Sequence, residues 1–331
     1  MKEYTYNFHL LLVTIFIYLS IETLAAQQKI ISFETDEGTW MALDVSPNGN
    51  TINFELLGDI YNLPIQGGTA EPLIAGNAFQ SQPRFSPDGK NIVFISDESG
   101  ADNVWIADFD GKNTRQITEY NQELLVSPEW SWDGRAILVT VITDGFQRTA
   151  NLYHFDISTK HKTLLVGNTN GIAARLISSP APGPYMGAVH PKNLGFYFSS
   201  ITPRAYGVRK GATSEIKFYN NKTKLTEKVL IDKGNAMKPL VSKDGKWLAY
   251  GAMSEGKTGL RLRNLESSKE KWLVFPFVAN ELEARATRDV LPNYTFTPDG
   301  ISIIAAYGGK IHQINLANGE DIIVPFKVKI E

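Results

Sequence analysis

The chain has 331 residues, a length that corresponds to one large domain or two ordinary ones. Its 33 Lys and Arg residues are balanced by 35 Asp and Glu residues, so it lacks the basic excess of a nucleic-acid-binding protein. It contains no cysteine, which excludes disulfides, thiol catalysis and metal sites built on thiolates. The hydrophobic fraction of 43% is enough to fill a core and argues against disorder.

The N-terminus has the features of a secretory signal peptide. Lys2 precedes an apolar run over residues 10–21, and small residues follow as far as Ala26. A membrane-spanning helix needs roughly 18 or more apolar residues, and Glu22 interrupts this shorter run. We therefore predict a signal peptide over residues 1–26, no integral membrane segment after its cleavage, and a periplasmic or secreted protein.

A four-residue turn recurs along the rest of the chain. Each copy opens with Ser or Thr, has Asp or Asn in third place and ends in Gly, as suits a type I turn. The copies are Ser46–Gly49, Ser86–Gly89, Ser131–Gly134, Ser242–Gly245 and Thr297–Gly300. The gap between the third and fourth is about twice the others, and His190–Asn193 stands in its middle. Because Asn best replaces Gly at positive φ, we predict that this is a degenerate copy and that the chain has six repeats.

Short runs rich in β-branched and aromatic residues surround each turn and predict four strands per repeat. In the second repeat they are Gln82–Phe85, Asn91–Ser96, Asn103–Ala107 and Thr114–Thr118. One four-stranded sheet cannot bury both of its faces, whereas six twisted sheets in a ring bury one another. The sequence therefore predicts an all-β fold over residues 27–331: a six-bladed β-propeller with four antiparallel strands per blade.

Two further expectations concern the ring. Its end strands would expose free edges unless they pair, so we expect Lys29–Thr35 to pair beside the last blade, whose outer strand is predicted over Ile322–Lys329. Ser178–Gly187, between the third and fourth blades, is predicted to be a loop because it is rich in Pro and Gly.

Two resemblances to known families sharpen this prediction. The phrases Phe85–Gly89 and Asn103–Trp105 resemble the repeat of TolB-type propellers; TolB is the periplasmic partner protein of the bacterial Tol–Pal envelope system. Longer stretches are similar to the N-terminal region of exported amidohydrolase-family proteins, in which a TolB-like propeller region precedes a metal-dependent hydrolase barrel. These stretches are Thr35–Trp40, Leu57–Tyr61, Thr258–Arg263 and Arg285–Pro292. This sequence stops at Glu331, so the resemblance implies the propeller region without the hydrolase domain.

The sequence offers no catalytic constellation. The histidines are His9, His154, His161, His190 and His312, and none forms the His-x-His pair of a metal-dependent amidohydrolase. Ala252–Gly256 comes nearest to a Gly-x-Ser-x-Gly nucleophile elbow but lacks the first Gly. No Gly-rich phosphate loop is present. We therefore expect no catalytic residue, no metal and no cofactor.

Candidate binding residues come from two long loops that depart from the repeat. Clustered Arg and Tyr on such loops favour recognition of a partner or an anion. The candidates are Arg204, Tyr206, Arg209, Arg285, Arg288 and Asp289. An equally supported alternative is that Arg285, Arg288 and Asp289 form an ion-pair network that seats their loop on the ring.

The preferred hypothesis is a non-catalytic exported propeller that binds a protein or domain partner and no nucleic acid. The alternative is a detached N-terminal accessory domain of a metal-dependent amidohydrolase, which docks on or gates that enzyme. A hydrolase reading frame after the codon for Glu331 would support it. A third hypothesis, a propeller enzyme with its site in the channel mouth, requires several carboxylates or histidines that converge on the axis.

Overall fold

The computed structural model describes residues 31–143, 149–167, 183–202, 212–230, 235–282 and 289–330. These residues form strands and turns, and none of them belongs to a helix that could span a membrane. The predicted signal peptide over residues 1–26 lies outside the described part and stays a prediction.

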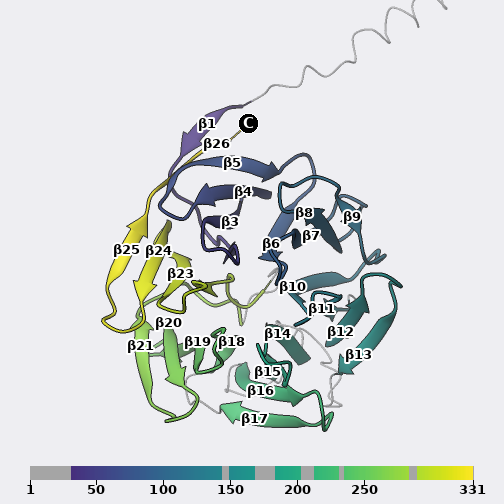
Figure 1. The fold of residues 1–331 in the computed structure, drawn as a ribbon, viewed down its shortest axis with the longest axis vertical. Coiled ribbons are helices and arrows are strands. Elements are labelled where there is room, and N and C mark those ends of the chain that lie inside the picture. Colours follow the sequence, from purple (N-terminus) through teal and green to yellow (C-terminus); the bar gives the residue numbers. More distant parts are fainter. Residues whose placement is uncertain are drawn as a thin grey trace, which may run out of the picture. The chain divides into compact units, whose positions relative to one another are not determined.

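Six blades of four antiparallel strands form a ring within residues 35–328, and the sheet of blade 1 is extended by further strands, which confirms the predicted six-bladed propeller (Figure 1). Each blade uses four strands that are consecutive in sequence, and its first strand is the innermost. Blades 1 to 3 are β2 (Leu43–Val45), β3 (Thr51–Leu56), β4 (Asp59–Pro64) and β5 (Gly68–Ile74); β6 (Gln80–Phe85), β7 (Asn91–Ser96), β8 (Asn103–Asp108) and β9 (Arg115–Gln116); β10 (Leu124–Trp130), β11 (Ala136–Ile142), β12 (Ala150–Asp156) and β13 (Lys162–Val166). Blades 4 to 6 are β14 (Gly183–Val189), β15 (Gly195–Thr202), β16 (Thr213–Asn220) and β17 (Thr226–Leu230); β18 (Met237–Val241), β19 (Trp247–Ser254), β20 (Lys257–Asn264) and β21 (Glu270–Val274); β22 (Thr295–Phe296), β23 (Ser302–Tyr307), β24 (Lys310–Asn315) and β25 (Asp321–Val324).

The core lies between neighbouring blades. Val93 and Ile95 of blade 2 pack in one buried cluster with Ile137 and Val139 of blade 3. Blades 4, 5 and 6 share a second cluster that includes Ile216, Leu248 and Ile303. Because each sheet covers the apolar face of the next, burial of these side chains holds the ring together.

The recurring turn joins the first strand of every blade to the second. In blade 2 the Ser86 hydroxyl donates to Asp88 Oδ1 (2.7 Å) and accepts from the Asn91 amide (3.0 Å). Gly89 ends the turn at φ 72°, and Asn193 takes the same place in blade 4 at φ 53°. The predicted degenerate sixth copy is therefore confirmed.

The direction of the strands determines on which of the two faces of the ring each connection between strands lies. All six recurring turns lie on one face together with the turns between third and fourth strands, because neighbouring strands are antiparallel. We call this the turn face. Connections between second and third strands, and those between blades, belong to the opposite face, which we call the loop face.

The ring closes differently from the prediction. Pro325, which has no N–H to donate, interrupts the last predicted strand and separates β25 from β26 (Phe326–Ile330). β26 leaves blade 6 and pairs in parallel with β5 of blade 1, with Phe326 opposite Gly68. Gly67 is required at this crossing because a Cβ there would lie 2.2 Å from the Pro325 carbonyl oxygen. The strand order places β1 (Phe33–Thr35) next to β26, so the expected pairing of the terminal strands occurs, with blade 1 in place of blade 6 as the closing sheet.

The prediction that Ser178–Gly187 is a loop is also wrong in part, because β14 begins at Gly183. β14 is an innermost strand that pairs only with β15, so Pro184 needs no N–H for a second neighbour. The Pro184 carbonyl instead accepts from the Thr140 hydroxyl of blade 3 (3.1 Å). Gly183 allows this close approach, since a Cβ there would lie 2.1 Å from the Ala150 carbonyl oxygen.

Candidate functional site

The innermost strands enclose a channel that opens on the turn face as a cavity of about 320 Å³, which we call the funnel. Every blade contributes to it through two equivalent positions. The floor positions, two residues before each recurring turn, are Asp44, Arg84, Glu129, Ala188, Leu240 and Thr295. The rim positions, second in each turn, are Pro47, Pro87, Trp132, Pro191, Lys243 and Pro298.

Contacts at the rim join five of the six neighbouring pairs of blades. A Cβ on the closing glycine of a turn would lie 3.4–3.8 Å from the rim proline of the preceding blade. The pairs are Gly49 with Pro298, Gly89 with Pro47, Gly134 with Pro87 and Gly245 with Pro191. In blade 3 the rim residue is Trp132, whose indole N–H donates to the Pro191 carbonyl of blade 4 (2.6 Å). The turn motif therefore joins blades as well as strands, and its contact between blades 6 and 1 crosses the ring closure.

The floor holds a charged cluster from three blades. Arg84 pairs with Asp44 at 3.0 Å and with Glu129 at 2.8 Å, and its side chain is 12% exposed. The other oxygen of each carboxylate accepts a backbone N–H, from Phe85 (2.9 Å) and from Trp130 (3.0 Å). Each charge is thus paired and hydrogen-bonded, as buried ions must be. We call Asp44, Arg84 and Glu129 the floor triad.

Burial shifts the titration of this triad. It raises the pKa of Glu129, and the nearby Arg84 only partly opposes that effect. Burial would lower the pKa of Arg84, but Asp44 and Glu129 outweigh it and leave this pKa raised. With both carboxylates ionised the triad carries one net negative charge, and a proton on Glu129 would neutralise it.

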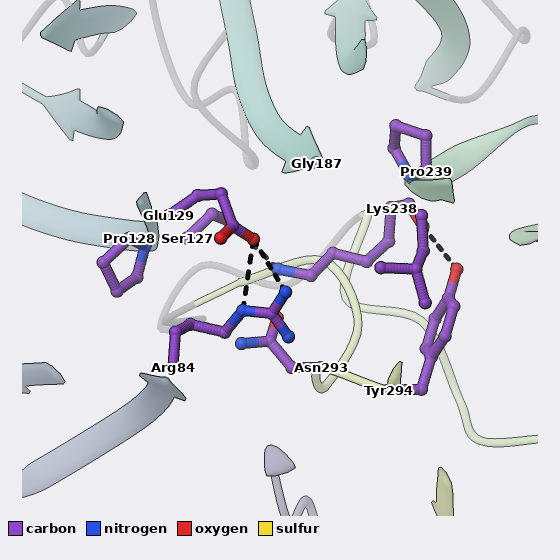
Figure 2. Close-up of a pocket in the computed structure, with 10 residues that line it drawn as sticks. Arg84, Ser127, Pro128, Glu129, Gly187, Lys238, Pro239, Asn293 and Tyr294 are labelled. Carbon is purple, nitrogen blue, oxygen red and sulfur yellow. Dashed lines mark hydrogen bonds and ion pairs between the residues drawn. The ribbon is translucent and has the colours of Figure 1, made fainter. Parts of the chain in front are cut away.

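Below the floor the described residues leave little space in the channel. The gap beneath the triad has a volume of about 10 Å³, roughly that of one water, and Lys238, Asn293 and Tyr294 lie at its edge (Figure 2). Asp289 forms a buried ion pair with Lys238 and accepts from the Ser127 hydroxyl (2.6 Å). We call residues 289–294 the plug.

The plug packs against three blades. Val290 and Leu291 are fully buried in an apolar cluster that includes Val126 of blade 3 and Tyr185 of blade 4. The Tyr294 hydroxyl donates to the Lys238 carbonyl of blade 5 (Figure 2). Burial and the charge of Asp289 raise the pKa of Tyr294 well above its usual value, so this hydroxyl keeps its proton.

The channel residues under the floor share an unusual backbone that sequence reasoning missed. Gln82, Ser127 and Lys238 have φ of 56°, 55° and 50°, and each marks a bulge in the innermost strand of its blade. The Ser127 amide donates to Gln82 Oε1 (2.7 Å), which links two bulges directly. The signal was present in the sequence: a polar residue followed by Pro stands four residues before the turn in three repeats.

Of the six predicted site residues, Arg204, Tyr206, Arg209, Arg285 and Arg288 lie outside the described residues. The sixth, Asp289, lies in the channel, where its ion pair with Lys238 anchors the plug to blade 5. The binding role of the six residues stays a prediction. The alternative, a network of Arg285, Arg288 and Asp289 that seats the loop, also stays a prediction, because both arginines lie outside the described residues.

The rejected catalytic candidates occupy ordinary structural positions. Ser254 pairs with Lys257 across a two-residue hairpin turn that contains Gly256 at φ 74°. His312 stacks on Tyr307 with ring centroids 3.8 Å apart and contacts Asp321. Within the described residues, His, Asp and Glu form no group of three or more that could hold a metal ion.

Comparison with known proteins supports the same fold. The family model of the Tricorn protease N-terminal beta propeller domain matches residues 42–180. The chain is 29% identical over 94 residues to Tricorn protease homolog 1 of Streptomyces coelicolor, and 39% identical over 75 residues to the uncharacterized peptidase YuxL of Bacillus subtilis. These matches cover 28% and 22% of this chain and only 9% and 11% of the relatives, so the chain spans a small part of their length.

Solved structures extend the likeness to most of the chain. TolB from Acinetobacter baumannii superposes with a TM-score of 0.61 at 17% identity, over 87% of this chain and 65% of TolB. The putative TolB from Agrobacterium tumefaciens gives 0.58 at 19% identity, over 80% of this chain and 87% of that one. The fold is a TolB-like β-propeller. The tricorn protease contains a similar propeller, with a TM-score of 0.54 at 12% identity over 90% of this chain and 35% of the protease.

Proposed function

We propose that this protein is an exported, non-catalytic propeller that binds a segment of a partner protein in the funnel. The observation that carries the proposal is the construction of the funnel, to which all six blades contribute a floor and a rim residue. Four prolines and Trp132 give the rim an apolar surface, and ion pairs hold the floor charges in place. An apolar rim around a few fixed polar groups suits recognition of a protruding peptide segment.

The state of the floor triad favours binding over catalysis. A carboxylate held by a guanidinium and by backbone amides is fixed in position and has its charge paired. In the triad, all four carboxylate oxygens accept hydrogen bonds from Arg84 or from backbone amides. The groups therefore serve to fix the shape and charge of the floor.

Export is supported by the predicted signal peptide and by the TolB-like fold, since TolB itself is periplasmic. The resemblance to amidohydrolase-family proteins makes a hydrolase domain one candidate partner. Both the hydrolase domain as a partner and the location of the protein remain predictions.

One observation favours an enzyme as the second candidate function. Two carboxylates, Asp44 and Glu129, converge on the channel beside Arg84, and burial raises the pKa of Glu129, as it does in many general acids. These two carboxylates supply part of the group of several carboxylates or histidines that the channel-mouth enzyme hypothesis requires.

Site-specific crosslinking tests the proposal. A photoreactive side chain replaces Lys243 on the funnel rim, and a matched control replaces Lys269, which is also exposed in blade 5 but lies outside the funnel. In extracts of the producing cells we expect a protein adduct from position 243 and none from position 269. The same purified protein is assayed against amide, ester and lactone substrates. Turnover that Glu129→Gln abolishes would reject the binding proposal in favour of the enzyme.

A further inference from the structure

Blade 4 departs from the other five at a position that the structure defines in every blade. The position is the second residue of the turn that joins the third strand of a blade to the fourth. In each blade its backbone N–H donates to the carbonyl of the residue directly after the recurring turn of the same blade. These equivalent residues are Ile65, Phe109, Ile157, Asn221, Leu265 and Leu316. Five are large and apolar, and only blade 4 has an amide.

Asn221 lines a second cavity, a cleft of about 480 Å³ between blades 3 and 4. Two other departures from the repeat line the same cleft: Trp132, which takes the place of the rim proline, and Asn193, which takes the place of the turn glycine. These three residues belong to three different turns of two blades, yet the fold brings them to one cavity. Trp132 and Asn221 both donate hydrogen bonds to the degenerate turn of blade 4, to Pro191 and to Asn193.

The amides at the cleft are only partly used. Asn221 Nδ2 donates to the carbonyl and to Oδ1 of Asn193, at 3.2 and 2.9 Å. Within the described part of the chain, Asn221 Oδ1 and Asn193 Nδ2 form no further hydrogen bond. One acceptor and one donor group therefore remain for a ligand.

The walls of the cleft combine apolar and polar surface. Phe196 and Tyr219 stack with ring centroids 4.8 Å apart on the blade 4 side. His154 and Thr163 line the blade 3 side. Trp132 stands at the edge with 52% of its surface exposed, which is unusual for the largest side chain.

We propose that the cleft between blades 3 and 4 binds a carbohydrate of one or two sugar rings. A sugar ring presents C–H groups on its faces and hydroxyl groups on its edge, so it needs a flat apolar platform beside planar hydrogen-bonding groups. Trp132 provides the platform, and Asn193, Asn221 and His154 provide groups that can donate to or accept from hydroxyls. The volume is within the range of small-ligand pockets, roughly 300–1,000 Å³.

Sugar binding is tested by titrating the purified protein with cellobiose, chitobiose and digalacturonate, followed by calorimetry and by tryptophan fluorescence. Two variants restore the residues of the other blades: Asn221→Leu fills the cleft, and Trp132→Pro removes its platform. We expect wild-type protein to bind at least one of the disaccharides, and each variant to bind it at least about tenfold more weakly. Lys243→Pro restores the rim proline of blade 5 away from the cleft, and it should bind sugar like wild type.

The variants should also fold, because each introduces a residue that equivalent turns already contain. Thermal unfolding of both is expected within a few degrees of wild type, so loss of binding will not reflect loss of fold. Absence of binding to all three disaccharides would overturn the proposal. So would sugar affinity that Asn221→Leu leaves unchanged, or an Asn221-dependent affinity for peptides alone. Because Asn221 does not line the funnel, failure here leaves the funnel proposal unaffected.

Discussion

The two faces of the propeller are built from the same strands but are specified in different ways. On the turn face, the six recurring turns have equivalent geometry, and each is stabilised by its own residues, as Ser86 and Asp88 stabilise the turn of blade 2. On the loop face, among the described residues, the plug fills the channel through contacts with blades 3, 4 and 5. The comparison shows that repetition gives a regular rim, whereas filling of the channel depends on residues that occur once.

The largest expected effect comes from breaking the plug. In Asp289→Ala, Lys238 stays buried without its counter-charge, and loss of one partner of a buried pair costs about 3–5 kcal/mol. Urea unfolding of the purified protein should show this as a lower free energy of unfolding. The control is Asp110→Ala, which removes an exposed pair with Lys112 and should change stability little. Equal effects of the two substitutions would show that the plug does not depend on its ion pair.

This contrast explains what could be predicted from the sequence. The recurring turn, its degenerate copy at His190–Asn193 and the six blades follow from local turn chemistry, which is visible in any one repeat. The plug could not be predicted in the same way, because Asp289 and Lys238 lie 51 residues apart and meet only once the ring has formed. The pairing of β26 with blade 1 is likewise non-local.

The candidate site likewise combines positions that recur in every repeat with contacts that form only in the closed ring. The floor and rim positions recur at fixed distances from each turn, so an alignment of the repeats would have found them. That Arg84 joins Asp44 and Glu129 depends on the ring placing blades 1, 2 and 3 in order around the channel. Trp132 and Asn221 can be recognised as departures from the repeat only when the equivalent positions of all six blades are compared.

The second prediction concerns the pH dependence of the floor triad. Burial raises the pKa of Glu129 above its ordinary value of 4.5, so the folded state holds this proton more tightly than the unfolded chain does. The contribution of this proton to stability is therefore fully present below pH 4.5 and is lost as pH rises through the raised pKa. Glu129→Gln has no such proton to lose. The free energy of unfolding of wild type minus that of the variant should fall with rising pH, and a difference that rises would contradict the assigned direction of the pKa.

The third prediction tests whether the recurring turns are independent of one another. Ser86→Ala removes a hydroxyl that donates to Asp88 and accepts from Asn91, which should cost about 1–2 kcal/mol. Ser131→Ala removes the equivalent hydroxyl in blade 3 and should cost a similar amount. Chemical denaturation of the two single variants and the double variant measures their coupling. If the turns are local units, the two losses should add within about 0.5 kcal/mol.

The smallest expected effect concerns the degenerate turn of blade 4. Asn193 adopts φ 53°, where Asn and Gly are tolerated and a side chain such as Ala costs roughly 1–2 kcal/mol. Asn193→Gly should therefore stay within about 0.5 kcal/mol of wild type, because easier backbone geometry offsets the entropy of glycine in the unfolded chain. Asn193→Ala should be clearly less stable than either. If the Ala and Gly variants had the same stability in thermal unfolding, the turn His190–Asn193 would not depend on a left-handed closing residue. The turn of blade 4 would then differ in kind from the recurring turns of the other five blades.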